Sequence, residues 1–464
     1  MVDFTPIYHR LPYPGRVVVA SARGLYLRRW RYGRETRELM DAAGSREHWS
    51  RTEWDSWQTE QLDKVLTRAA RFVPHYRRLW DERKKRGDKR SWRNLDNWPV
   101  LHKETVRNDP ESFLAEDRRA KKLFKFHTSG STGTPLGLWI GRSNLRRWYA
   151  LTEARWRGWH GVSRDDRWVI FGGQLVVPAE VTKPPFWVWN QGLRQLYVSS
   201  IHVAPWSVPE MARAIDKSKA IYALGYPSAL FEFSKIALEN STAVPRMKVV
   251  ISNAEPLFEF QREVIGKAFR APVVDTYGLA EMVAAAGECD AGSLHLWPDA
   301  GVVEVLADGE DKPLADGQIG RLIGTGLIND DMPLIRYEIG DRGSLKPGRF
   351  PCECGRSLPL LGEIEGRVDD LVVTPDGRRV GRLDHAFKKN LPIRAAQVQQ
   401  ESLHSIRVLV EPASGFDQQA REEIARSLRD RLGDMKIEVE EVELIPRGPN
   451  GKLRGVVSRI STGS

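Results

Sequence analysis

A run of hydroxyl side chains broken by glycines, His127–Pro135 (HTSGSTGTP), constrains the fold of this chain more than any other feature. Glycines let the backbone approach an anion closely, and serine and threonine hydroxyls add donors for phosphate oxygens. The run lacks the Gly-Lys-Ser/Thr ending of a Walker loop, which argues against a kinase or a GTPase. Taken alone, it is either a phosphate-binding turn or a polar surface turn.

Further motifs follow in a fixed order. They are Tyr277–Glu281 (YGLAE), Arg336–Asp341 (RYEIGD), Gly366–Asp370 (GRVDD) and Pro446–Arg454 (PRGPNGKLR). In this order and spacing they resemble the motif set of the adenylate-forming superfamily, which includes acyl-CoA synthetases, aryl-CoA ligases and peptide-synthetase adenylation domains. The resemblance is to the phenylacetate-CoA ligase branch with its CapK-like relatives. It runs from about Leu101 to Ile460, and Ile7–Pro12 is similar to the CapK-like subgroup.

The resemblance implies that ATP, with Mg²⁺, activates a carboxylic acid as an acyl-adenylate and releases pyrophosphate. Negative charge then builds on the phosphates and requires cations and preorganised donors. The residues implied to hold the β- and γ-phosphates are Thr128, Ser129, Gly130, Ser131, Thr132, Gly133 and Thr134. Those implied around the rest of the nucleotide are Asn253, Ala254 and Glu255 at the adenine pocket, Tyr277 beside adenine, Gly278 where the chain passes the nucleotide, Glu281 on Mg²⁺ and Asp341 on the ribose.

A lysine near the C-terminus completes the implied catalytic group of Lys452, Glu281, Thr128 and Arg367. Lys452 is either an exposed lysine or, with its ordered partner motifs, the cation that reaches the carboxylate oxygen and the α-phosphate. Arg367 resembles an arginine that contacts ribose or phosphate. Asp369 resembles the hinge about which a small domain turns between adenylation and acceptor transfer.

The acceptor is the least defined part of the prediction. Coenzyme A is the expected acceptor, and an amine is the alternative, as in amide-forming ligases of polysaccharide or secondary-metabolite biosynthesis. The usual acidic pair after the hinge is replaced by Leu383-Asp384-His385, which puts the CoA tunnel in question. A non-catalytic nucleotide-binding assembly protein is a further hypothesis, and the retention of Lys452, Glu281 and Asp341 argues against it. By position, the expected acid pocket is lined by Phe171, Gly172, Gly173, Gly225, Tyr226 and Pro227.

The chain has three cysteines, and all of them fall in two short segments with one histidine: Cys289-x5-His295 and Cys352-x-Cys354. Three thiolates and one imidazole are a tetrahedral zinc set. Free thiols and a redox switch are the alternatives. Zinc-bearing members of the phenylacetate-CoA ligase branch show a similar arrangement. Because protein would fill every position, such a zinc ion is expected to be structural.

Length and composition predict an α/β protein with a large and a small domain. At 464 residues a single core is improbable. Apolar runs alternate with helical segments from about Leu123 to Ile364, which is typical of α/β folds. We expect a helical N-terminal segment over 1–100, an adenylation core with the zinc loop over 101–366, and a mobile C-terminal α+β domain over 367–464.

The net charge of +10 favours anionic ligands. The basic residues are scattered, so we expect no nucleic-acid partner. Arg16–Tyr32 is denser in arginine and either contacts a membrane surface or packs on the body as a helix.

No apolar stretch of about 18 residues and no secretory signal are present, which predicts a cytoplasmic protein. The oligomeric state is open, a homodimer being one option.

Overall fold

The computed structural model describes residues 5–127, 136–174, 176–177, 181–347, 352–367, 372–375, 379–380, 383–387, 391–446 and 453–460. Its first part is helical, with α1 (Thr5–Arg10), α2 (Tyr13–Arg31), α3 (Thr36–Arg46), α4 (Arg51–Phe72), α5 (Pro74–Lys85), η1 (Leu95–Asn97), α6 (Lys103–Asn108), η2 (Pro110–Phe113) and η3 (Ala120–Lys122). Helix α4 begins at a capping box, in which the Ser50 side chain and Glu53 satisfy each other's backbone N–H groups. The helical character predicted for the first hundred residues is confirmed.

A six-stranded sheet of order β4-β5-β3-β6-β7-β8 forms the next layer. Its strands are β3 (Trp168–Gly172), β4 (Trp187–Asn190), β5 (Gln195–Ser199), β6 (Tyr222–Gly225), β7 (Val250–Ser252) and β8 (Val273–Val274). Only β4 among them pairs antiparallel, with β5. The parallel strands are nearly continuous apolar runs because both faces of the sheet are covered. The adjoining helices are α7 (Arg142–Thr152), η4 (Glu153–Arg157), η5 (Gly158–His160), η6 (Ser200–His202), α8 (Val208–Ser218), α9 (Pro227–Glu239) and α10 (Glu259–Phe269).

The middle of the chain is rich in antiparallel strands. A hairpin joins β1 (Phe124–His127) to β2 (Gly137–Ile140), and two further sheets contain β9 (Thr276–Gly278), β10 (Ala285–Glu288), β11 (Leu294–Leu296), β12 (Gly301–Leu306), β13 (Gly320–Gly326), β14 (Tyr337–Leu345) and β15 (Leu361–Arg367). Leu66 of α4, Tyr76 of α5, Leu138 of β2 and Tyr337 of β14 belong to one buried cluster. The N-terminal helices therefore share a hydrophobic core with these sheets.

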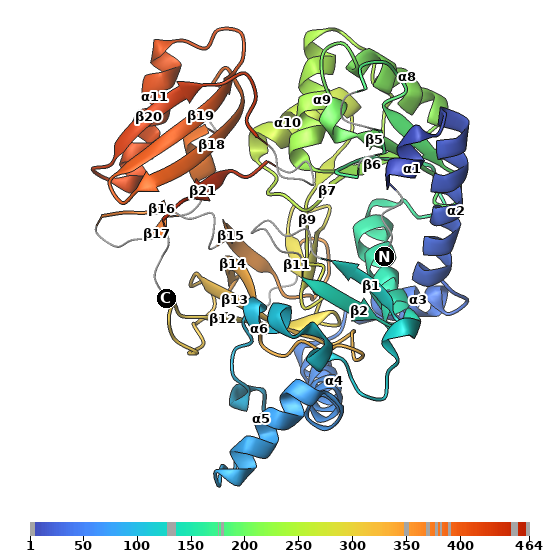
Figure 1. Ribbon diagram of the computed structural model, residues 1–464, viewed down its shortest axis with the longest axis vertical. Helices are drawn as coiled ribbons and strands as arrows, with labels where there is room; N and C mark the ends of the chain where they lie inside the picture. Colours follow the sequence, from blue (N-terminus) through green and yellow to red (C-terminus); the bar gives the residue numbers. More distant parts are fainter. Residues whose placement is uncertain are drawn as a thin grey trace.

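The C-terminal part has a core of its own. Its elements are β16 (Val372–Val373), β17 (Arg379–Val380), η8 (Leu383–Phe387), β18 (Ile393–Ser402), β19 (Ser405–Pro412), α11 (Gln418–Leu432), β20 (Lys436–Glu441) and β21 (Val456–Ser458). Val398, Val408, Ile424 and Leu428 are fully buried between α11 and the sheet of order β20-β19-β18-β21. Figure 1 shows this part, in orange and red, beside the larger one. The predicted mixed α/β fold with a smaller C-terminal unit is confirmed, while the residue at which the two divide stays a prediction.

Candidate active site

Several of the predicted site residues lie at or directly after the ends of parallel strands in the six-stranded sheet. Strands β3, β6 and β7 end at Gly172, Gly225 and Ser252, and in such sheets ligands bind at the carboxyl ends of the strands. A Cβ at Gly225 would lie 2.7 Å from the carbonyl oxygen of Phe171, so only glycine fits there. The backbone N–H of Asn253 donates to the carbonyl of Gly225 at 3.0 Å, which fixes the start of the segment after β7.

The segment predicted to line the adenine pocket carries an unsatisfied acceptor. Asn253 Oδ1 is buried and has no hydrogen-bond partner among the residues that the structure describes. Ala254 holds a left-handed backbone with φ of 66°, and Glu255 accepts a hydrogen bond of 3.1 Å from the backbone N–H of Ser228. A buried acceptor without a donor destabilises a fold. An amino group such as that of adenine would satisfy it, so these residues fit a nucleotide.

Two other predicted residues are in direct contact. The Tyr277 hydroxyl, on β9, donates a hydrogen bond of 2.8 Å to Oδ2 of Asp341, on β14. Asp341 is buried, and its register partner on β15 is Arg367. The structure thus brings together three positions that are far apart in the sequence.

Glu281 lies beside the same strands. The hydroxyl of fully buried Tyr337 donates a hydrogen bond of 2.9 Å to Glu281 Oε1, which orients a half-buried carboxylate. The sequence analysis explains the glycine at position 278 by a backbone that passes close to the nucleotide. In the structure a Cβ there would meet the indole of Trp156 at 3.2 Å, so packing within the protein already favours glycine.

Other predicted positions are placed differently or lie outside the described residues. Phe171 is fully buried, and the centre of its ring lies 5.0 Å from that of Phe233. In this structure it therefore belongs to the core between β3 and α9. Tyr226 is half-buried. Its burial raises the pKa of its hydroxyl, and the nearby Glu255 carboxylate adds a smaller rise. The predicted residues that lie outside the described part of the chain are Thr128, Ser129, Gly130, Ser131, Thr132, Gly133, Thr134, Asp369 and Lys452.

A buried carboxyl group that the sequence reading did not single out lies next to the adenine segment. Asp275, which follows β8, accepts a 2.6 Å hydrogen bond from the hydroxyl of Ser252 at the end of β7. Burial raises the pKa of Asp275 to about 6, and the Glu288 carboxylate adds to the rise. Glu288 itself accepts from the backbone N–H of Asp275 at 2.6 Å.

The three cysteines and His295 converge into what we call the cysteine–histidine cluster. Their ligand atoms all lie within 4.8 Å of one another. The Sγ atoms of Cys289 and Cys352 are 3.8 Å apart, and Cys354 Sγ is 3.4 Å from His295 Nε2. A tetrahedron with zinc–sulfur bonds of about 2.3 Å has edges of about 3.8 Å, whereas a disulfide needs about 2.05 Å. The spacing therefore fits a metal ion and excludes a formed disulfide between Cys289 and Cys352.

The imidazole of His295 has the protonation that a metal ligand needs. His295 Nδ1 lies 3.2 Å from the carbonyl oxygen of Leu358, so Nδ1 carries the proton and Nε2 is left as the ligand atom. Burial lowers the pKa of His295, which keeps the ring neutral. Both cysteine turns close in the same way, because the N–H of Gly292 donates to the carbonyl of Cys289 and that of Gly355 donates to the carbonyl of Cys352.

A carboxylate directly after helix α3 supports this cluster, and sequence reasoning missed it. Glu47, which follows α3, accepts hydrogen bonds from Arg356 Nε at 2.9 Å and Trp159 Nε1 at 2.8 Å. The Trp159 ring meets His295 edge-on at 5.8 Å. Nothing in the local sequence around Glu47 marks it, whereas the run of tryptophan and arginine at Glu153–His160 was a visible signal of buried aromatic packing.

Comparison with solved structures places this fold in a known class. The chain superposes on the crystal structure of 2-hydroxyisobutyryl-CoA ligase in its postadenylation state, bound to an acyl-AMP, with a TM-score of 0.69. The two sequences are 22% identical, and the match covers 89% of this chain and 91% of that one. The fold is therefore that of the adenylate-forming enzymes.

Sequence comparison narrows the class to a branch. Protein CapK of Staphylococcus aureus is 24% identical over 98% of this chain and 99% of its own length. The phenylacetate-coenzyme A ligase of Escherichia coli K12 is 25% identical over 69% of this chain and 72% of its own. The family model of the CapK C-terminal domain matches residues 372–459. These similarities support a place for the chain in the CapK and phenylacetate-CoA ligase branch of the adenylate-forming superfamily.

Proposed function

We propose that this protein is an AMP-forming carboxylate ligase, which makes an acyl- or aryl-adenylate from ATP and transfers the acyl group to CoA. One observation carries the proposal: the hydrogen bond between Tyr277 on β9 and Asp341 on β14 holds together two residues that the sequence predicts beside adenine and ribose. The similarity to phenylacetate-CoA ligases and to an acyl-AMP-bound CoA ligase supports it.

In this proposal each residue has a separate task. Asp341 accepts hydrogen bonds from the ribose hydroxyls, since a carboxylate has lone pairs beyond the one that Tyr277 occupies. Asn253 accepts from the adenine amino group. Glu281, oriented by Tyr337, binds Mg²⁺, which supplies charge neutralisation at the phosphates. Thr128–Thr134 donate to the phosphates, and Lys452 and Arg367 add positive charge near the reacting carboxylate.

The test is isotope exchange between pyrophosphate and ATP over a panel of carboxylic acids. An aryl or short acyl acid that supports exchange, with AMP and pyrophosphate as products, supports the adenylation reaction. ADP as the product, or no exchange with any acid in a folded, metal-replete protein, contradicts it.

The acceptor is tested separately, because the change at Leu383-Asp384-His385 favours keeping the amine alternative. Leu383 is buried in the C-terminal core. Preformed acyl-adenylate is offered CoA, a panel of amines, or water. Faster consumption by CoA supports the acid–thiol ligase, whereas consumption by an amine and not by CoA supports the amide-forming ligase.

We also propose that the cysteine–histidine cluster binds one structural zinc ion. Two donor pairs have the spacing of a tetrahedral site, and all four donors lie within 4.8 Å of one another; since the protein supplies every ligand, no position is left for an activated water. The ion would link the β10–β11 turn to the loop before β15, next to the strand that carries Asp341.

A further inference from the structure

Helix α2 exposes an apolar stripe to solvent. Half of the large hydrophobic side chains that the described residues expose lie between Ile7 and Tyr26. On α2, Val18 is 68% exposed, Leu25 57% and Tyr26 53%. Val18, Leu25 and Tyr26 are spaced by seven and eight residues, so they lie on one side of the helix. Exposed apolar stripes of this kind mark interaction surfaces.

The opposite side of α2 is fixed to the body of the protein. A Cβ at Gly24 would lie 1.9 Å from Asn190 Oδ1, and a Cβ at Gly192 would lie 2.3 Å from the backbone nitrogen of Leu25. The Ser21 hydroxyl accepts a 3.0 Å hydrogen bond from the N–H of Gln191. The helix is thus seated against the β4–β5 turn through its small residues, and its exposed stripe is not needed for that packing.

The charge of this segment has one sign. Residues 5–34 contain seven arginines and no aspartate, glutamate or lysine. Among the described residues, no carboxylate forms an ion pair with Arg23 or Arg29, while Arg28 pairs with the exposed Asp165 at 2.5 Å. An amphipathic helix that combines exposed apolar side chains with arginine favours an anionic bilayer surface.

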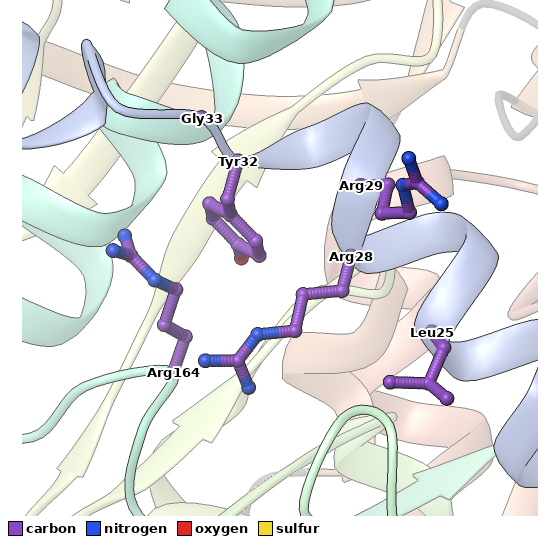
Figure 2. A pocket seen from close by; sticks show the side chains of 6 residues that line it. All are labelled: Leu25, Arg28, Arg29, Tyr32, Gly33 and Arg164. Atoms are coloured by element: carbon purple, nitrogen blue, oxygen red, sulfur yellow. The ribbon is translucent and has the colours of Figure 1, made fainter.

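A basic pocket adjoins the stripe. Its volume is about 550 Å³, and it is lined by Leu25, Arg28, Arg29, Tyr32, Gly33 and Arg164. Figure 2 shows Arg28 and Arg164 extending toward the same space beside the Tyr32 ring, with Leu25 at the rim. The Arg164 guanidinium lies 4.4 Å from the centre of that ring. Guanidinium groups arranged in this way can donate to phosphate oxygens.

We propose that α2 docks this protein on a membrane surface that contains anionic phospholipid. The stripe of Val18, Leu25 and Tyr26 enters the interface, and the arginines of the pocket contact lipid phosphate. None of the described helices has the length and apolar character needed to cross a bilayer, so the contact is made by a helix lying on the surface. A second copy on this face is disfavoured, because pairing would bring two acid-free arginine segments together.

The position of α2 in the fold keeps the C-terminal part away from the proposed membrane contact. Helix α2 runs along one edge of the molecule, and the C-terminal sheet with α11 lies at the opposite edge (Figure 1). Docking through α2 therefore leaves the C-terminal part facing away from the membrane. This inference does not depend on the proposed ligase activity.

The experiment is flotation of the full-length protein with vesicles of phosphatidylcholine alone or of phosphatidylcholine and phosphatidylglycerol in equal amounts. We expect binding to the anionic vesicles only, and weaker binding as salt is raised. Leu25→Glu should reduce vesicle affinity about tenfold or more, and Arg29→Glu about fivefold or more. Matched controls are Leu444→Glu, at a side chain 67% exposed, and Arg86→Glu, which should bind like the unaltered protein. Thermal melts establish that each variant is folded.

Four results overturn the proposal. One is the absence of binding to anionic vesicles, and another is equal loss in Leu25→Glu and Leu444→Glu. The third is self-association in light scattering that Leu25→Glu abolishes without any vesicle binding, which assigns the stripe to a second copy. Binding of inorganic phosphate that Arg164→Ala removes, with no vesicle binding, assigns the pocket to a soluble anion instead. Unchanged pyrophosphate exchange in Leu25→Glu keeps this result separate from the proposed function.

Discussion

The hydroxyl of Tyr277 and the carboxylate of Asp341 are joined by a 2.8 Å hydrogen bond that links β9 to β14 across 64 positions of sequence. A hydrogen bond to a charged group contributes roughly 1.5–3 kcal/mol, and it also fixes the direction of the carboxylate. The pair is therefore a sensitive place to probe nucleotide binding.

Tyr277→Phe removes the donor and leaves the ring. We expect the KM for ATP to rise about tenfold in pyrophosphate exchange, with a smaller change in kcat, because Asp341 loses its orientation. Tyr26→Phe, at an exposed tyrosine of α2, is the matched control and should leave both constants unchanged. An unaltered KM in Tyr277→Phe would separate this pair from ATP binding.

Lys452→Ala should lower acyl-adenylate formation by about 10²-fold or more, because a cation that acts in the transition state is lost. Lys436→Ala, on β20 of the same C-terminal unit, removes an exposed lysine as the control. Equal exchange rates in the two variants would remove Lys452 from the mechanism.

Asp369→Pro tests the predicted hinge. Proline fixes the backbone, so adenylation should be spared while transfer to the acceptor is blocked. The two half-reactions are measured separately by exchange and by consumption of preformed adenylate. If both fall by the same factor, Asp369 is not a hinge.

Metal analysis of the purified protein should find about one zinc per chain. Cys352→Ser should lose the metal and lower the melting temperature clearly, since metal binding contributes to folding. Glu353→Gln, between the two cysteines but outside the cluster, should keep both. Protein that is isolated without chelators and contains no metal would leave the cluster as ordinary thiols.

Asp275 should make stability depend on pH. Its pKa rises from an ordinary 3.8 to about 6 in the folded chain, so the folded state binds the proton more tightly than the unfolded state does. The stabilising contribution is complete below about pH 3.8 and is lost as pH rises through about 6. The shift corresponds to about 3 kcal/mol.

The measurement compares the free energy of urea unfolding of the parent protein and Asp275→Asn between about pH 4 and pH 7. The asparagine keeps an acceptor for Ser252 and cannot ionise. The parent should lose stability relative to the variant over this range. A constant difference would mean that Asp275 does not titrate there.

The sequence could predict the features that depend on local pattern. Apolar runs such as Trp168–Phe171 lie in strands of the six-stranded sheet, and the C-terminal part has the predicted mixture of strands and helix. The four donors of the cysteine–histidine cluster were also identifiable, because cysteine is rare in this chain and its spacing is distinctive.

Features that depend on tertiary packing could not be predicted in this way. The burial of Phe171 in the core and the raised pKa of Asp275 follow from what α9 and the strand ends place around them. The exposure of Val18 and Leu25 could not be predicted for the same reason. The helical period of α2 does not show which side of the helix packs against β4 through its small residues. Only the fold determines which face stays open.

The contacts of Glu47 have a consequence for how the chain is made. Its partners Trp159 and Arg356 are synthesised more than 100 and 300 residues later, as the sequence separations of 112 and 309 record. A ribosome must therefore release most of the chain before this buried carboxylate has both of its guanidinium partners, Arg155 and Arg356, and contacts of such long range slow folding. We expect nascent chains that end before Arg356 to pair Glu47 with Arg155 alone, and to complete the contacts of this carboxylate in a late step.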